Sequence, residues 1–238
     1  KLAHQIKEGH LELDLYRPRK DFRFFPCTSE QGVETVGQIC RWALEQGYET
    51  REIQVLAPMY KGKAGIHALN KHLQDIFNPP GKEKRELVFG SHVFRVGDKV
   101  LQLVNNSEEQ VFNGDVGRVV AILDQRESPD GKEGLVVRFD EREVRYERSQ
   151  LNQLSLAYCC SIHKAQGSEY PLVVIPLVNA YWPMLRRNLV YTAVTRGKEQ
   201  LIFCGDIKAI ETAIARQETA SRLTTLQESI EGPIGKHS

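Results

Sequence analysis

Two short polar segments constrain what this chain can fold into more than any other part of the sequence. Each lies where an apolar, strand-like run meets a helical pattern, and the first covers residues 161–169. The preceding residues 156–160 are apolar and predict a buried strand. Ser161 then offers a hydroxyl as an N-cap, residues 162–166 predict a short helix, and Gly167 is expected to end it.

His163 and Lys164 are the unusual residues of this first segment. Both would lie in the first turn of the predicted helix, where free backbone N–H groups favour anions such as phosphate. Cations do not stabilise that end of a helix, which indicates that they serve something other than stability. Two interpretations stay open: contacts to phosphate, or ordinary surface residues on a capped helix.

The second segment, residues 189–198, places a cation in a similar position. Leu189, Ala193 and Arg196 fall at i, i+4 and i+7, so Arg196 lies on the stripe that the helix would bury. Gly197 is expected to end the helix, and residues 201–204 resume as a buried strand. Arg196 either complements the helix dipole or binds an anion, and the spacing alone leaves both open.

The composition is that of an ordinary globular protein. The 238 residues are 41% hydrophobic and 26% charged with a formal net charge of +1, so a nucleic-acid site would have to be a local patch. The 5 cysteines have no metal-ligand spacing, which favours reduced, mostly buried thiols. We see no signal peptide and no apolar run near ~18 residues, and therefore expect a cytoplasmic protein without a membrane span.

The patterns along the chain change twice. Helical periodicity is clear at residues 31–46 and again around 66–77, with a short apolar strand at 53–57 between them. From about residue 88 several short β-type runs follow, separated by turn sequences, and strand–helix alternation returns from Ser155. The sequence therefore predicts one α/β domain in two chain segments, interrupted by a small antiparallel β-barrel.

The expected divisions follow from these changes. We expect the first segment of the α/β domain at residues 1–87, the barrel at 88–152 and the second segment of the α/β domain at 153–220. Residues 221–238 are expected to form a frayed tail.

The sequence lacks the parts of an ATP-driven motor that hold nucleotide and metal. A phosphate-binding loop reads G-x-x-x-x-G-K-[S/T], whereas every Gly-Lys pair here is followed by Ala, Glu or His. Asp140 and Glu141 follow a strand-like run as a Mg²⁺-binding pair would, but residues 142–146 read as the second strand of a hairpin. We therefore expect a hairpin turn there, no metal ligands, and no ATP hydrolysis by this chain alone.

Several of these segments resemble motifs of the RecD-type superfamily 1 DNA helicases, the family of the exodeoxyribonuclease V alpha subunit. Residues 161–169 resemble motif V, and residues 190–198 resemble motif VI. Residues 55–62 are similar to the block that follows motif IV. Residues 94–100 and 112–117 resemble the small inserted barrel of the stand-alone RecD-like enzymes. Departures from the usual motifs are small: Ser161 for Thr, Ala165 for Ser, and Gly197 for Ala.

The resemblance implies a second RecA-like motor domain. ATP with Mg²⁺ would lie between it and an N-terminal RecA-like domain of the same parent chain, outside this sequence. Arg196 would be the arginine finger that stabilises charge on the γ-phosphate. Gln166, Gly167 and Glu169 would lie beside the nucleotide, Glu169 near the ribose, and Gln166 would couple this site to DNA. A further nucleotide-facing arginine is expected before Lys1.

The resemblance also implies a path for single-stranded DNA. Ser161 and His163 resemble the strand contacts of motif V, and Lys164 is a further candidate. In the loop after residue 57, Lys61 would contact phosphate and Tyr60 would offer a stacking face, with packing inside the loop as an equal alternative for Tyr60.

The barrel offers weaker signals. Residues 113–117 are expected to form a structural turn. The alternative that this turn lies at the barrel rim beside DNA stays open. Arg95, Lys99 and Arg118 are scattered cations of the kind that usually lie on a surface, and are weak DNA candidates.

Three functions stay open. The resemblance favours the C-terminal motor half of an ATP-dependent DNA helicase of 5′→3′ polarity that acts in DNA repair and recombination. The alternatives are a non-catalytic module that binds single-stranded DNA, and a helicase-like part of a conjugative relaxase. The sequence does not identify nuclease-complex subunits as partners.

Overall fold

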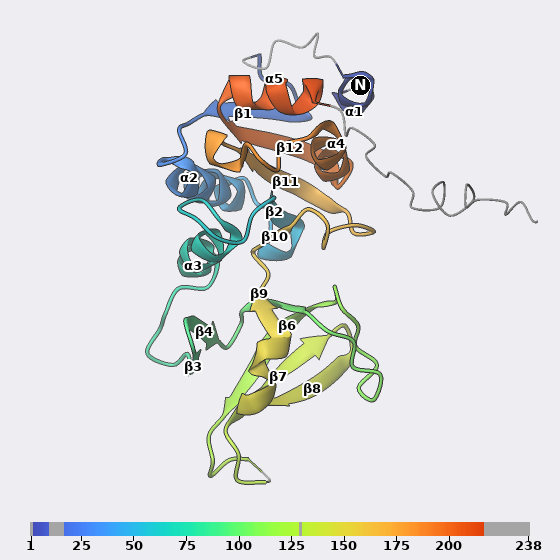
Figure 1. Cartoon of the computed structure of the whole chain (residues 1–238). Coiled ribbons are helices and arrows are strands. Elements are labelled where there is room, and N and C mark those ends of the chain that lie inside the picture. The colour runs from blue at the N-terminus through green and yellow to red at the C-terminus, as the bar shows by residue number, and fades with distance from the viewer. Residues whose placement is uncertain (1, 10–16, 129, 217–238) are drawn as a thin grey trace, which may run out of the picture.

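The computed structural model describes residues 2–9, 17–128 and 130–216. A parallel sheet covered by helices forms the upper part in Figure 1, and an antiparallel insertion forms the lower part. The chain enters the insertion after α3 (Ile66–Phe77) and returns to the parallel sheet at β10 (Cys159–Ser161). This confirms the predicted α/β fold that is interrupted by antiparallel structure.

Five parallel strands form the centre of the upper part. Their spatial order is β1-β12-β11-β2-β10, and every neighbouring pair is parallel. Strands β2 and β11 are almost continuously buried, as expected for a parallel sheet that is covered on both faces. The bounds are β1 (Phe22–Pro26), β2 (Ile53–Ala57), β11 (Tyr170–Leu177) and β12 (Gly197–Gly205), in addition to β10.

Helices cover both faces of this sheet. On one side α2 (Gly32–Glu45) packs against α3 and contacts the central strands, while α3 contacts β10. On the other side α4 (Arg187–Val194) contacts α1 (Leu2–Glu8), α5 (Ile207–Ala215) and β12 (Figure 1). The helical periodicity that predicted α2 and α3 is confirmed. Gly47, which follows α2, has a φ of 93°, a left-handed conformation that glycine adopts without strain.

The insertion contains a hairpin and a five-stranded antiparallel sheet. The hairpin pairs β3 (Glu86–Phe89) with β4 (His92–Arg95). The larger sheet has the order β8-β7-β6-β5-β9. Its strands are β5 (Lys99–Gln102), β6 (Val116–Leu123), β7 (Gly134–Phe139), β8 (Arg142–Glu147) and β9 (Leu154–Leu156). Short 3₁₀ helices lie between the strands and helices, at η1 (Thr50–Glu52), η2 (Arg148–Gln153) and η3 (Asn179–Tyr181).

The prediction of a single strand over residues 156–160 is wrong. Leu156 ends β9, which pairs with β5 of the insertion, whereas Cys159 begins β10 beside β2. Asn70 of α3 lies at the break: its amide Nδ2 donates to the carbonyls of Leu156 (3.1 Å) and Cys159 (2.8 Å), and its Oδ1 accepts from the Cys159 N–H (2.8 Å). The run crosses between two sheets while staying buried, so its apolar character gives no sign of the break.

A buried carboxylate joins the insertion to the α/β part. Asp98 is 0% exposed and accepts hydrogen bonds from Gln74 (2.6 Å), Asn78 (2.7 Å), the Arg95 N–H (2.6 Å) and the Tyr158 hydroxyl (2.8 Å). Burial raises the pKa of Asp98, and the donated hydrogen bonds oppose that rise. Because the donors come from α3, the hairpin and the returning chain, one side chain fixes the three where they meet.

The other predictions about organisation have mixed outcomes. All five cysteines lie in the described ranges and are free thiols, four of them buried. No helix in the described ranges has the length and apolar character that crossing a membrane requires. The division at residues 87/88 and 152/153 stays a prediction, and most of the predicted domain end and tail, residues 217–238, lies outside the described residues.

Asp98→Ala should destabilise the protein, because its four donors would lose their common acceptor in a buried place. We expect the free energy of unfolding to fall by about 3 kcal/mol, measured by urea denaturation. The exposed Asp21→Ala is the matched control and should stay within about 0.5 kcal/mol of the wild type. Equal stability of the two variants would show that the Asp98 cluster does not hold the joint.

Candidate nucleotide and nucleic-acid interface

The motif V segment (residues 161–169) connects β10 to β11 by consecutive turns. The Ser161 hydroxyl accepts from the Lys164 N–H (3.3 Å), as expected of an N-cap, but the helix predicted over residues 162–166 is wrong. Apart from one bond from the Ala165 N–H to the Ser161 carbonyl (3.3 Å), the backbone bonds join residues three apart, as in Gln166 N–H to His163 carbonyl (3.3 Å), which is the pattern of turns. Gly167 ends them with a φ of 90°.

The motif VI segment (residues 190–198) runs from α4 into β12. The helix ends at Val194, and Gly197 is already the first residue of β12, so the prediction of Gly197 as the helix stop is wrong. Thr195 forms the C-cap in a right-handed conformation, which needs no glycine. Arg196 therefore lies in the short link between helix and strand, beyond the helical stripe on which the sequence placed it.

Arg196 is half-buried and joins the two segments. Its guanidinium donates to the carbonyls of Thr192 (3.2 Å) and Ser168 (3.2 Å) and to the Thr195 hydroxyl (3.1 Å). Its own carbonyl accepts from the Tyr170 N–H (2.8 Å). All three acceptors are neutral, and no carboxylate of the described residues forms an ion pair with Arg196. The positive charge is thus positioned without being neutralised.

The other residues predicted to bind nucleotide lie around this contact. Glu169 is exposed, with a carboxylate oxygen 3.4 Å from Lys198 Nζ of the motif VI segment. Gln166 and His163 are exposed on the turns before it and line a hollow of about 370 Å³ together with α4 residues such as Thr192. The structure therefore brings the motif V and motif VI candidates together on one surface.

The predicted DNA contacts gather at the carboxyl ends of two neighbouring strands. Ala57 of β2 pairs with Ser161 of β10, so the loop after β2 and the motif V turns leave the sheet side by side. Tyr60 and Lys61 are exposed on that loop, Tyr60 to 46%. Ser161 itself is only 6% exposed. Its predicted strand contact stays a prediction, and its visible contact is the bond to Lys164.

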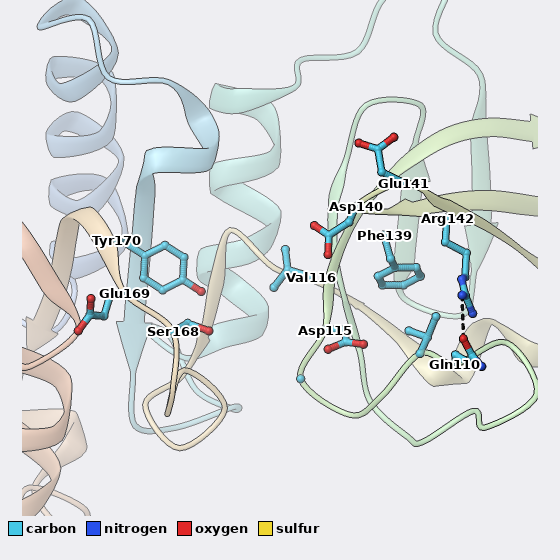
Figure 2. Close-up of a pocket in the computed structure, with 12 residues that line it drawn as sticks. Gln110, Asp115, Val116, Phe139, Asp140, Glu141, Arg142, Ser168, Glu169 and Tyr170 are labelled. Atoms are coloured by element: carbon cyan, nitrogen blue, oxygen red, sulfur yellow. Dashed lines mark hydrogen bonds between the residues drawn. The ribbon is translucent and has the colours of Figure 1, made fainter.

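A cleft of about 780 Å³ separates the motif V segment from the insertion (Figure 2). Ser168, Glu169 and Tyr170 line one wall, and the opposite wall includes Asp115 and the β7–β8 turn. The predicted hairpin turn is confirmed, with Asp140 in a left-handed conformation at a φ of 48°. Carboxylates are frequent in this cleft, which makes it unfavourable for phosphate. Within the described ranges, no group of three or more potential ligands could hold a metal ion.

Two lysines connect the insertion to the parallel sheet, and the sequence did not indicate either contact. Lys164 Nζ donates to Asn113 Oδ1 at the rim turn of the insertion, whose predicted turn is confirmed. Lys99 Nζ donates to Gln54 Oε1 (2.9 Å) and lies 5.3 Å from the centre of the Tyr170 ring. Burial lowers the pKa of Lys99 to about 8.

The three scattered cations of the insertion have different environments. Arg95 is buried and forms ion pairs with Asp75 (2.8 Å) and Glu86, so it is no surface residue. Lys99 points into the joint between the two parts, and only Arg118 is exposed as expected.

Comparison with known proteins identifies the class of this fold and site. Residues 69–139 match the family described as the ATP-dependent RecD-like DNA helicase SH3 domain, and residues 156–204 match the UvrD-like helicase C-terminal domain. The structure of the Pif1 helicase from Candida albicans has the same RecA-like fold, with a TM-score of 0.54 over 91% of this chain and 55% of that chain at 15% identity.

Two curated relatives give the family. The chain is 40% identical over 178 residues to the ATP-dependent RecD2 DNA helicase of Deinococcus radiodurans and 30% identical over 179 residues to the RecBCD enzyme subunit RecD of Mycolicibacterium smegmatis. Each match covers 75% of this chain but only 23% and 29% of the relatives, so the chain spans about a quarter of their length. The chain belongs to the RecD-like superfamily 1 helicases.

Proposed function

We propose that this chain is the second RecA-like motor domain, with its inserted barrel, of an ATP-dependent DNA helicase. The observation that supports this most is Arg196. A guanidinium that is half-buried, held by neutral acceptors and left without a carboxylate partner is suited to an anion that arrives from outside. The family resemblance gives that anion as the γ-phosphate of ATP, and 5′→3′ as the direction of movement.

The nucleotide itself would be held mainly outside these residues. No Gly-Lys pair of this sequence is followed by the Ser or Thr that completes a phosphate-binding loop. A separate N-terminal RecA-like domain of the parent chain would therefore supply that loop and the Mg²⁺ ligands. From this side, Arg196 would face the phosphates, and Gly167 and Glu169 would lie beside the nucleotide, with Glu169 near the ribose. Gln166 would connect this surface to the strand-binding residues. By itself the chain would not hydrolyse ATP.

Single-stranded DNA would cross the edge where β2 and β10 end. His163 and Lys164 on the motif V turns and Lys61 on the neighbouring loop provide charge, and Tyr60 provides an exposed aromatic ring. Ser161 is buried beneath this edge and would contribute indirectly, because its hydroxyl accepts from the Lys164 N–H and so orients the turn. This edge is contiguous with the surface around Arg196 through the motif V segment, so strand binding and nucleotide hydrolysis would share one set of turns.

In the full-length protein, Arg196→Ala should lower DNA-stimulated ATPase activity by about 10³-fold while DNA binding is retained. Arg196→Lys should not restore it, because an ammonium lacks the planar, bidentate geometry of the guanidinium. Steady-state ATPase assays and fluorescence anisotropy with a labelled oligonucleotide measure the two properties. Lys208→Ala on α5 is the control and should behave as the wild type. ATPase activity retained in Arg196→Ala would contradict the assignment of a motor domain and would favour a module that only binds DNA.

The isolated 238-residue chain should bind single-stranded oligonucleotides weakly, with an affinity that falls as salt rises, because phosphate contacts release counterions. His163→Ala combined with Lys164→Ala should weaken binding further and flatten the salt dependence. A titration at several salt concentrations tests this. An affinity that changes neither with the salt concentration nor with the double substitution would contradict the placement of DNA on the motif V turns.

A further inference from the structure

Three rings form a row that leads away from the proposed DNA edge. The Tyr60 ring lies 5.8 Å from that of His67 on α3, and the His67 ring lies 5.9 Å from that of His92 on β4. His92 in turn lies 6.4 Å from the buried ring of Phe94, which anchors it. Tyr60 and His67 are exposed and His92 is half-buried. The two ring pairs are tilted, by 47° and 60°, and the exposure of Tyr60 and His67 leaves room for contacts with further rings.

The row connects the two parts of the molecule. It begins on the loop that leaves β2 beside the motif V turns, follows the first turns of α3, and ends on the β3–β4 hairpin of the insertion. In Figure 1 this hairpin lies next to the lower end of α3. Between α3 and the hairpin a hollow of about 390 Å³ opens, lined by His67, Lys71 and His92 among others.

The charges along this row favour a polyanion. Lys61 and Lys63 are exposed on the loop, and Lys71 is exposed one helical turn after His67. The nearby carboxylates of Asp75 and Glu86 are both engaged by Arg95, which neutralises much of their charge. Cations spaced along stacking rings are the pattern with which proteins bind single strands without regard to sequence.

We infer that the path of single-stranded DNA continues beyond the motif V edge, along α3 and onto the β3–β4 hairpin, with Tyr60, His67 and His92 as a stacking platform for successive bases. Lys61 and Lys71 contact the phosphates. The hairpin of the insertion is thereby a part of the strand-binding surface. This inference rests on the proposed function, since it extends the same strand.

The test compares oligonucleotides of two lengths on the full-length protein without nucleotide. Oligo(dT) of about 8 residues is short enough to be held at the motif V edge without reaching His67 and His92, whereas one of about 16 residues would extend over them. His67→Leu with His92→Leu removes the aromatic faces and keeps apolar bulk; His67→Phe with His92→Phe keeps the faces. Fluorescence anisotropy gives the affinity for each length.

The leucine pair should weaken binding of the longer oligonucleotide by about 10-fold and leave the shorter one unchanged, while the phenylalanine pair stays within about twofold of the wild type for both. Unchanged binding of the short oligonucleotide also shows that the leucine variant is folded. Photo-cross-linking with 5-iodouracil in the longer oligonucleotide should label the peptide that contains residues 86–95, which the proposed DNA edge alone would not reach.

Two outcomes overturn the inference. If the leucine pair binds both lengths as the wild type does, or if no adduct forms on residues 86–95, the strand does not pass over His67 and His92, although the proposed function stands through its dependence on His163 and Lys164. If the wild-type full-length protein binds neither oligonucleotide, the proposed function fails and the extended path fails with it.

Discussion

The side chain of Asn70 holds the point at which the chain returns from the insertion to the parallel sheet, and both surfaces that we propose to be functional depend on that point. Its amide group bonds the carbonyls of Leu156 and Cys159 and the N–H of Cys159. Without these bonds, the N–H and the carbonyl of Cys159 would each lose a hydrogen bond at a buried crossing, which is costly. By fixing Cys159, Asn70 sets the register of β10 beside β2. Ser161 therefore lies beside Ala57, and two polar loops leave the sheet at one edge.

Local patterns predicted most of the secondary structure, because burial on one side repeats with the period of a helix or a strand. This holds for α2, α3, β2 and the β7–β8 hairpin. The prediction from local patterns failed for residues 156–160, because an apolar run has the same pattern whichever sheet it joins. The residue that bonds the backbone at the break, Asn70, lies 86 residues before Leu156. The prediction failed again at Gly197, where a glycine that suits a helix stop instead begins a strand.

The candidate site shows the same limit. The motifs identified Arg196, Glu169 and the residues around them, and they do lie on one surface. The sequence could not show that the motif V segment folds as turns, because an N-capping Ser161 and a left-handed Gly167 suit a short helix as well as consecutive turns. Nor could it show that Lys164 reaches Asn113, which lies 51 residues away on the insertion.

The insertion is held to the α/β part at separate places, and this decides how it can move. Asp98 ties the hairpin to α3 and Tyr158, Lys99 reaches Gln54, and Lys164 holds the rim turn. Rotation of the insertion would break several buried hydrogen bonds together, whereas small shifts of α3 would carry the hairpin along. The hairpin is thereby bonded to α3, and α3 follows the loop that leaves β2 beside the motif V turns. The joint between the insertion and the α/β part that carries the proposed nucleotide surface is therefore polar, buried and fully bonded at Asp98.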